Sequence, residues 1–452
     1  MDKAIGRSMD RQIARLAIPA LGALLAEPLY VLVDTAIVGH LGRNQLAALG
    51  ISAAILSTTF GVFNFLAYST TSAVARAFGA GDHRRALRHG MAGIWLGAAI
   101  GLALTAVGFA IAKPVVEVIG GSASVQRDAV LYTRISMLGA TFLMVAVATT
   151  GYLRGVQDTR TPFAIAIGSN VLNVVLELLF VYGFHWGIAG SAWGTVIAQS
   201  AAAIAYLAVM RQHVANAGGN HEPTTRFSFR PDWSEIRSTA VVGSQLMVRT
   251  GSLLATFLVA STMAARIGDV QIAAHQIAWQ LWLFLALALD AIAIAGQAMI
   301  GERLGGNDTT GARTAAARML RWGWWGGCTA AVAIAVARPG LASIFTDDAA
   351  VRDELLRVLW YVALMQPLAA IVFVIDGILI GAGDSAYLAK AMAGAGAVFG
   401  IAAVVVAARG ADLPSLWVAL HDFMFARLIG LALRYRGERW MVLGPRESVK
   451  TS

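Results

Sequence analysis

Long apolar segments recur along the whole chain, and they constrain its fold more than any other feature of the sequence. A helix needs about 20 consecutive apolar residues to cross a bilayer, because the hydrocarbon core is about 30 Å thick. Hydrophobic residues make up 58% of the chain and charged residues 13%, which is about half of the charged fraction in soluble domains. The sequence therefore predicts an all-α integral membrane protein and excludes a soluble enzyme.

Twelve segments have the length and composition of a membrane-spanning helix. They are residues 12–38, 45–75, 88–112, 128–154, 161–183, 187–210, 236–266, 272–302, 313–337, 352–381, 386–408 and 414–433. The one sizeable polar connection follows the sixth segment and includes the run from Gly218 to Pro223. We therefore expect an N-lobe of six helices at 1–210, a cytoplasmic linker at 211–235, a C-lobe of six helices at 236–435 and a cytoplasmic tail at 436–452.

The two halves of the chain carry the same turn motifs at a constant spacing. A shift by 226 residues, half of the chain length, places 79–82 (Gly-Ala-Gly-Asp) on 305–308 (Gly-Gly-Asn-Asp). The same shift places 155–158 (Gly-Val-Gln-Asp) on 381–384 (Gly-Ala-Gly-Asp). An even number of helices in each half makes the two lobes parallel repeats, related by an axis along the membrane normal. Such a pair encloses a central cleft and suits transport by alternating access.

The distribution of Lys and Arg sets the expected orientation. With the N-terminus inside the cell, most of the 35 basic residues lie on the cytoplasmic side, as the positive-inside rule requires. We therefore expect a multi-pass protein of the inner (plasma) membrane with both termini in the cytoplasm. This placement accounts for the net charge of +9, so no nucleic-acid partner is expected.

A group of polar residues interrupts the apolar segments of the first half. Asp34, Glu177 and Thr195 fall at the same expected depth, in the outer leaflet. Asn170 and Asn173 share a helix face with Glu177, because the three are spaced by three and four residues. Charged groups within a bilayer are costly, so they need a function or a partner. The pattern predicts either a site for a proton or a small cation such as Na⁺, or a neutral hydrogen-bonded cluster that joins helices.

The first segment also contains two prolines and a second acidic residue. Pro19 and Pro28 each remove a backbone donor, so the helix can bend at either one. A bend close to Asp34 would link protonation to helix shape, although Pro28 would also fit a purely packed position. Glu27 precedes Pro28 and either joins the ion site or reaches the substrate cleft.

Charged residues also interrupt the second half, at Arg249, Asp290 and Asp376. An arginine and a carboxylate offset each other's burial cost, so the set is either a fixed structural pair or part of substrate binding and gating. Gln276 and Gln280 are candidates to line the same cavity.

Aromatic residues and one histidine lie in the second half. Most of its tryptophans are expected at the membrane interfaces, with Trp279 and Trp282 as possible cavity walls. His275 falls near the outer end of its segment, and we expect it at the interface rather than as a proton carrier.

Catalytic and cofactor motifs are not found in the sequence. It contains no Walker A motif, no G-x-S-x-G, no H-E-x-x-H and only one cysteine, Cys328. These observations predict a protein that is not an enzyme and that holds no metal or cofactor.

Three motifs resemble those of a known family. Residues 28–42 (Pro-Leu-Tyr-Val-Leu-Val-Asp-Thr-Ala-Ile-Val-Gly-His-Leu-Gly) resemble the first helix of the multidrug and toxic compound extrusion (MATE) transporters, in their DinF-like branch. Residues 151–160 (Gly-Tyr-Leu-Arg-Gly-Val-Gln-Asp-Thr-Arg) and 376–384 (Asp-Gly-Ile-Leu-Ile-Gly-Ala-Gly-Asp) are similar to that branch's loops after helices 4 and 10. The resemblance covers essentially the whole chain.

The resemblance implies a cation-driven antiporter, a monomer, that expels amphipathic and often cationic compounds. In this family, a network on helices 1, 5 and 6 carries the coupling ion, and a bent helix 1 is tied to its protonation. The matching positions are Asp34, Asn173, Thr195 and Pro19. Glu177 stands where archaeal relatives usually have an aspartate, so the charge is kept on a longer side chain.

Two functions remain open at this stage. The first is a secondary active multidrug efflux antiporter that exchanges amphipathic small molecules for H⁺ or Na⁺, without any other cofactor. The alternative is a flippase for a lipid or a lipid-linked precursor. A flippase predicts a strongly cationic cavity for a phosphate headgroup, and apart from Arg249 the spans offer little such charge.

Overall fold

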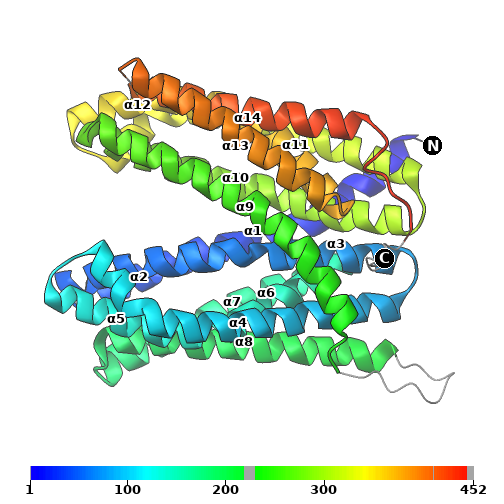
Figure 1. The fold of residues 1–452 in the computed structure, drawn as a ribbon, viewed down its shortest axis with the longest axis horizontal. Helices are drawn as coiled ribbons and strands as arrows, with labels where there is room; N and C mark the ends of the chain where they lie inside the picture. Colours follow the sequence, from blue (N-terminus) through cyan, green and yellow to red (C-terminus); the bar gives the residue numbers. More distant parts are fainter. Residues whose placement is uncertain (1, 218–229, 411, 445–452) are drawn as a thin grey trace. The chain divides into compact units, whose positions relative to one another are not determined.

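The computed structural model describes residues 2–217, 230–410 and 412–444, and nearly all of them lie in helices (Figure 1). The elements of the first half are α1 (Asp2–Gly39), α2 (Arg43–Gly61), η1 (Val62–Asn64), α3 (Phe65–Gly79), α4 (His83–Ile119), α5 (Ala123–Leu138), α6 (Ala140–Gly155), α7 (Arg160–Leu178), η2 (Leu179–Gly183) and α8 (Gly187–Ala217). Those of the second half are α9 (Trp233–Ile267), α10 (Asp269–Gly305), α11 (Thr309–Phe345), α12 (Ala349–Gly381), α13 (Ser385–Ala408) and α14 (Leu413–Arg436).

These helices confirm the predicted multi-span fold. Within the described residues, 11 spans are long and apolar enough to cross a membrane. The pair α5 and α6, bent by 48° at Gly139, supplies a twelfth span when counted as one. Each span begins and ends within a few residues of the predicted segments, and several extend beyond the length that one crossing needs.

The cytoplasmic turns at equivalent positions of the two halves adopt the same backbone geometry. Gly81 and Asn307, which are 226 residues apart, have φ angles of 76° and 61°. In both turns the following aspartate caps the next helix: Asp82 Oδ1 accepts from Arg85 N–H at 2.8 Å, and Asp308 Oδ1 accepts from Gly311 N–H at 2.7 Å. The repeated sequence motif thus encodes the same left-handed turn and helix start twice.

Glycine contacts inside each half repeat in the same way. A Cβ added at Gly151 of α6 would lie 2.6 Å from the carbonyl oxygen of Ala67 in α3. A Cβ added at Gly377 of α12 would lie 2.5 Å from that of Ala293 in α10. Both pairs are related by the same shift of 226 residues. The internal repeat therefore extends from turn chemistry to the close approach of packed helices, which requires a residue without a side chain.

The helices group into two compact units, and their boundary lies inside α1. The N-unit comprises the described residues of 22–243, and the C-unit comprises the described residues up to Leu21 together with Ser244–Gly444. In the N-unit, α6 packs against α3 and α4, and α7 packs against α8. In the C-unit, α12 is largely buried and packs against α10, α11 and α14.

This grouping differs from the predicted lobes in one respect. The lobes were expected at 1–210 and 236–435, whereas the first half of α1 groups with the second half of the chain. The linker expected at 211–235 is partly helical, since α8 runs to Ala217 and α9 begins at Trp233. Its residues 218–229, and residues 445–452 of the expected tail, lie outside the described residues.

Candidate functional site

Two acidic side chains of the N-unit meet at a single hydroxyl group. Ser191 of α8 lies 2.6 Å from Asp34 Oδ1 of α1 and 3.5 Å from Glu177 Oε1 of α7, measured from its Oγ. Asp34 is 5% exposed, and Glu177 and Ser191 are fully buried. The carboxyl groups of Asp34 and Glu177 are also within hydrogen-bonding reach of each other. Sequence positions 34 and 177, which were predicted to act together, are thus adjacent in the structure.

Asn173 and Thr195 complete the network around Glu177. With its amide oriented to satisfy its neighbours, Asn173 donates to Glu177 Oε1 at 3.1 Å and accepts from the Thr195 backbone N–H at 3.0 Å. The hydroxyl groups of Thr195 and Tyr30 lie 2.8 Å apart. The predicted set of Asp34, Asn173, Glu177 and Thr195 therefore forms one connected cluster on α1, α7 and α8.

Three members of the cluster were missed in the sequence. Tyr30 lies four residues before Asp34, and Ser191 four residues before Thr195, so helical spacing alone could have placed both on the same faces. The third is Tyr132 of α5, whose hydroxyl lies 3.4 Å from Asp34 Oδ2. No sequence signal marks Tyr132, because its position depends on how α5 packs in the tertiary structure.

One carboxyl oxygen of the cluster has no hydrogen-bond partner. Glu177 Oε2 is buried and unpaired within the described part of the chain. Burying a charged oxygen without a partner is costly, so such a group calls for a proton or a cation. The described residues contain no cluster of three or more His, Cys, Asp or Glu side chains of the kind that holds a metal ion.

The other candidates on α1 and α7 lie outside this network. Asn170 donates to the carbonyl oxygen of Ala26 at 2.8 Å and so binds the backbone of α1. Glu27 is exposed. Pro19 and Pro28 are half-buried within one continuous helix, and the boundary between the two units falls between them, after Leu21.

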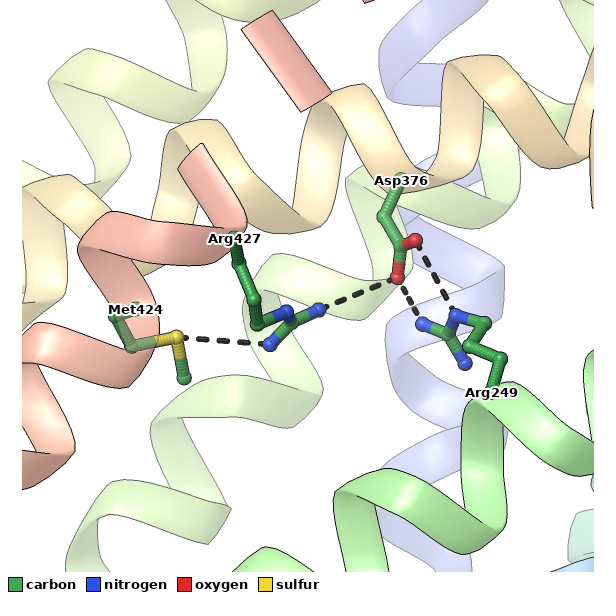
Figure 2. Close-up of polar contacts among 4 residues, drawn as sticks. All are labelled: Arg249, Asp376, Met424 and Arg427. Atoms are coloured by element: carbon green, nitrogen blue, oxygen red, sulfur yellow. Dashed lines mark hydrogen bonds and ion pairs between the residues drawn. The ribbon is translucent and has the colours of Figure 1, made fainter. Parts of the chain in front are cut away.

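The C-unit contains a buried cluster of two arginines and one aspartate (Figure 2). Arg249 of α9 donates through Nε to Asp376 Oδ1 at 3.2 Å and through Nη2 to Oδ2, which is a bidentate pairing. Arg427 of α14 reaches the same Oδ2 at 3.4 Å. Arg249 and Asp376 were predicted to pair, whereas Arg427 was not a candidate. Asp290, the third predicted member, is half-buried in α10 and has an interaction of its own.

A small cavity of about 200 Å³ lies within the C-unit and is lined mainly by aromatic side chains. Its walls are Phe257, Trp279, Trp282, Met365, Trp417, Leu420, Phe423 and Met424. The prediction that Trp279 and Trp282 form cavity walls is confirmed. Gln276 and Gln280, which were candidates for the same role, are exposed on α10.

His275 is not at an interface, and that prediction was wrong. The side chain is fully buried, its ring lies over Trp279 with the centroids 6.5 Å apart, and Trp417 is 5.8 Å away. The tertiary packing of α10 against α14 covers a position that, from its place in the segment, was expected near the membrane surface.

Known proteins resemble the chain over nearly its full length. It is 32% identical to protein DETOXIFICATION 44, chloroplastic, of Arabidopsis thaliana over 96% of this chain and 83% of that protein. It is 27% identical to DNA damage-inducible protein F of Escherichia coli (strain K12) over 95% of this chain and 92% of that one. Among solved structures, the fold matches a multidrug resistance MATE family transporter in an outward-facing conformation, with a TM-score of 0.85, 20% identity and 96% coverage of each chain.

A family model places these likenesses in one group. The MatE model matches residues 19–179 and 247–406, one region in each half of the chain, as the internal repeat predicts. The structural neighbours are transporters of the same kind, which agrees with the expectation that the chain is not an enzyme. The chain therefore belongs to the MatE family and is a multidrug and toxic compound extrusion transporter.

Proposed function

We propose that this transporter is an antiporter that exports amphipathic small molecules in exchange for H⁺ or Na⁺, with Asp34 and Glu177 as the groups that bind the coupling ion. The predicted orientation, with both termini in the cytoplasm of a cell whose inner membrane it spans, belongs to the same proposal. So do the monomeric state and the prediction that many substrates are cations.

The observation that carries the proposal is the shortage of donors around the two carboxyl groups. Ser191 has a single hydroxyl proton and two carboxyl oxygens within reach, at 2.6 and 3.5 Å. Glu177 Oε2 has no partner at all. A proton shared between the carboxyl groups, or a small cation held by their oxygens, satisfies both deficits. Because neither is a fixed part of the protein, either can be taken up and released.

The network also connects ion binding to helix position. Asp34 lies on α1, Glu177 on α7, and Ser191 and Thr195 on α8, so the ion joins three helices of the N-unit. Loss of the ion leaves two buried carboxylates in contact, which repel each other in a low-dielectric setting. The conformation that separates them is then favoured, and the ion shifts the equilibrium by its difference in affinity for the two states.

The decisive test uses purified protein in proteoliposomes loaded with ethidium, an amphipathic cation. Four conditions are compared: a pH gradient, a Na⁺ gradient, both, and neither. We expect one of the ions to drive ethidium movement, and Asp34→Asn to abolish it. Asp353→Asn, at an exposed position of α12, is the matched control and should transport normally. Full gradient-driven transport by Asp34→Asn would overturn the proposal.

A flippase for an anionic lipid is the second candidate, because Arg427 adds basic charge beside Arg249 that the sequence alone did not reveal. It predicts movement of a labelled phosphatidylglycerol between leaflets, and the same proteoliposomes can be assayed for it. Lipid movement without any coupled ethidium flux would favour the flippase.

A further inference from the structure

The guanidinium group of Arg427 is buried with fewer acceptors than it has donors. Arg427 is 2% exposed and carries five N–H groups. Its polar contacts are Asp376 Oδ2 at 3.4 Å and the sulfur of Met424 at 3.5 Å, and its Nε is buried without a partner. Neither contact is a strong hydrogen bond, since one is long and the other is to a thioether.

Asp376 does not make up the deficit. Both of its oxygens are engaged by Arg249 in a bidentate pairing, and Arg427 reaches only one of them from the other side (Figure 2). One carboxylate therefore stands between two guanidinium groups. A buried cation without a full set of acceptors is destabilising, so its presence calls for a missing acceptor.

The aromatic cavity of the C-unit lies next to Arg427. The guanidinium carbon is 5.6 Å from the centre of the Phe423 ring, and Nη1 contacts Met424, and both of these residues line the cavity. Phe423 and Met424 precede Arg427 by four and three residues, so all three lie on one face of α14. A molecule in the cavity is separated from Arg427 only by these two side chains.

A second unpaired donor lies on the cavity wall. Trp417 is 1% exposed, and its indole N–H, which can only donate, has no acceptor. Trp417 and Arg427 are ten residues apart on α14, or roughly 15 Å along the helix, so they mark opposite ends of the cavity. Both groups lack an acceptor and neither can serve as one.

We infer that the C-unit contains a binding site for amphipathic anions, in which aromatic side chains hold the apolar body and Arg427 binds a carboxylate or phosphate group. The inference rests on the proposed function in taking amphipathic small molecules as substrates, and it adds a negatively charged class to the expected cations. The bidentate Arg249–Asp376 pair fixes the neighbouring charge, which leaves the donors of Arg427 for the ligand.

The test compares benzoate with benzamide, which have the same shape but differ in charge at pH 7. Dissociation constants are measured by saturation-transfer NMR on the full-length protein in detergent, where no ion gradient exists. We expect benzoate to bind more tightly by about tenfold or more, as a hydrogen bond to a charged group implies. Arg427→Met should reduce benzoate binding to the level of benzamide, whereas Arg409→Met, at an exposed position, should leave it unchanged.

Equal binding of the two ligands, or benzoate binding that survives Arg427→Met, would overturn the inference. Should the Arg427→Met protein fail to fold, the benzoate and benzamide comparison on the unaltered protein still decides. Competition from phosphatidylglycerol nanodiscs, but not from phosphatidylcholine nanodiscs, would identify a lipid headgroup as the natural anion. Its absence would identify a soluble one. Since binding is measured without a gradient, the result is independent of whether Asp34 drives transport.

Discussion

The Ser191 hydroxyl donates to Asp34 across 2.6 Å and thereby joins α8 to α1 at the buried carboxyl cluster of the N-unit. Because this is a hydrogen bond to an acidic group, its removal should cost about 1.5–3 kcal/mol in the state that contains it. We expect Ser191→Ala to lower gradient-driven transport about tenfold or more in proteoliposomes. Ser169→Ala is the control, since that hydroxyl bonds only within its own helix, to the carbonyl oxygen of Ala166. Equal rates for the two variants would exclude a role for Ser191 in coupling.

Glu177→Gln should separate activity from stability. The neutral amide keeps the shape of the side chain but cannot release a proton or hold a cation as a carboxylate does, so coupled transport should be lost. The melting temperature in detergent should stay the same or rise, because a buried ionisable group is replaced by a neutral one of similar volume. Glu117→Gln, at a half-exposed position of α4, controls for the loss of an acid. A large fall in melting temperature with transport retained would contradict the assignment.

Asp376→Asn should destabilise the C-unit more than Arg427→Met does. Removing the negative charge leaves two buried guanidinium groups facing each other, which is expected to cost about 3–5 kcal/mol. Arg427→Met keeps the bidentate Arg249–Asp376 pair and removes the under-bonded partner, so its effect should be small. Thermal unfolding of both variants in the same detergent measures the order. The reverse order would show that Arg427, rather than Arg249, neutralises Asp376.

Gly377→Ala tests the close packing of α12 on α10. The added methyl group would meet the carbonyl oxygen of Ala293 at 2.5 Å, and backbone cannot move aside as a flexible side chain can. We expect a loss of about 1–3 kcal/mol in unfolding free energy, and a similar loss for Gly151→Ala at the equivalent position of the N-unit. At Gly400 of α13 a Cβ meets nothing within 4 Å, so Gly400→Ala should be neutral or stabilising. Thermal unfolding of all three variants provides the comparison.

The sequence by itself determined the membrane fold, because the requirement to satisfy every backbone polar group in lipid leaves helices as the only solution for long apolar segments. It also determined the repeat, since turn residues such as Gly81 and Asn307 act locally on backbone geometry. Asp34 and Glu177 were predictable for a similar reason, because an acid in an apolar span is costly wherever the chain folds.

Only the tertiary structure decided which side chains meet. Tyr132 reaches Asp34 because α5 packs beside α1 in the N-unit, and Arg427 reaches Asp376 because α14 packs on α12. His275 became buried, against expectation, for the same reason. Hydropathy and spacing act along one helix, whereas the neighbours of a side chain depend on contacts between helices far apart in sequence. The physical identity of each site was therefore fixed by packing, and its presence by composition.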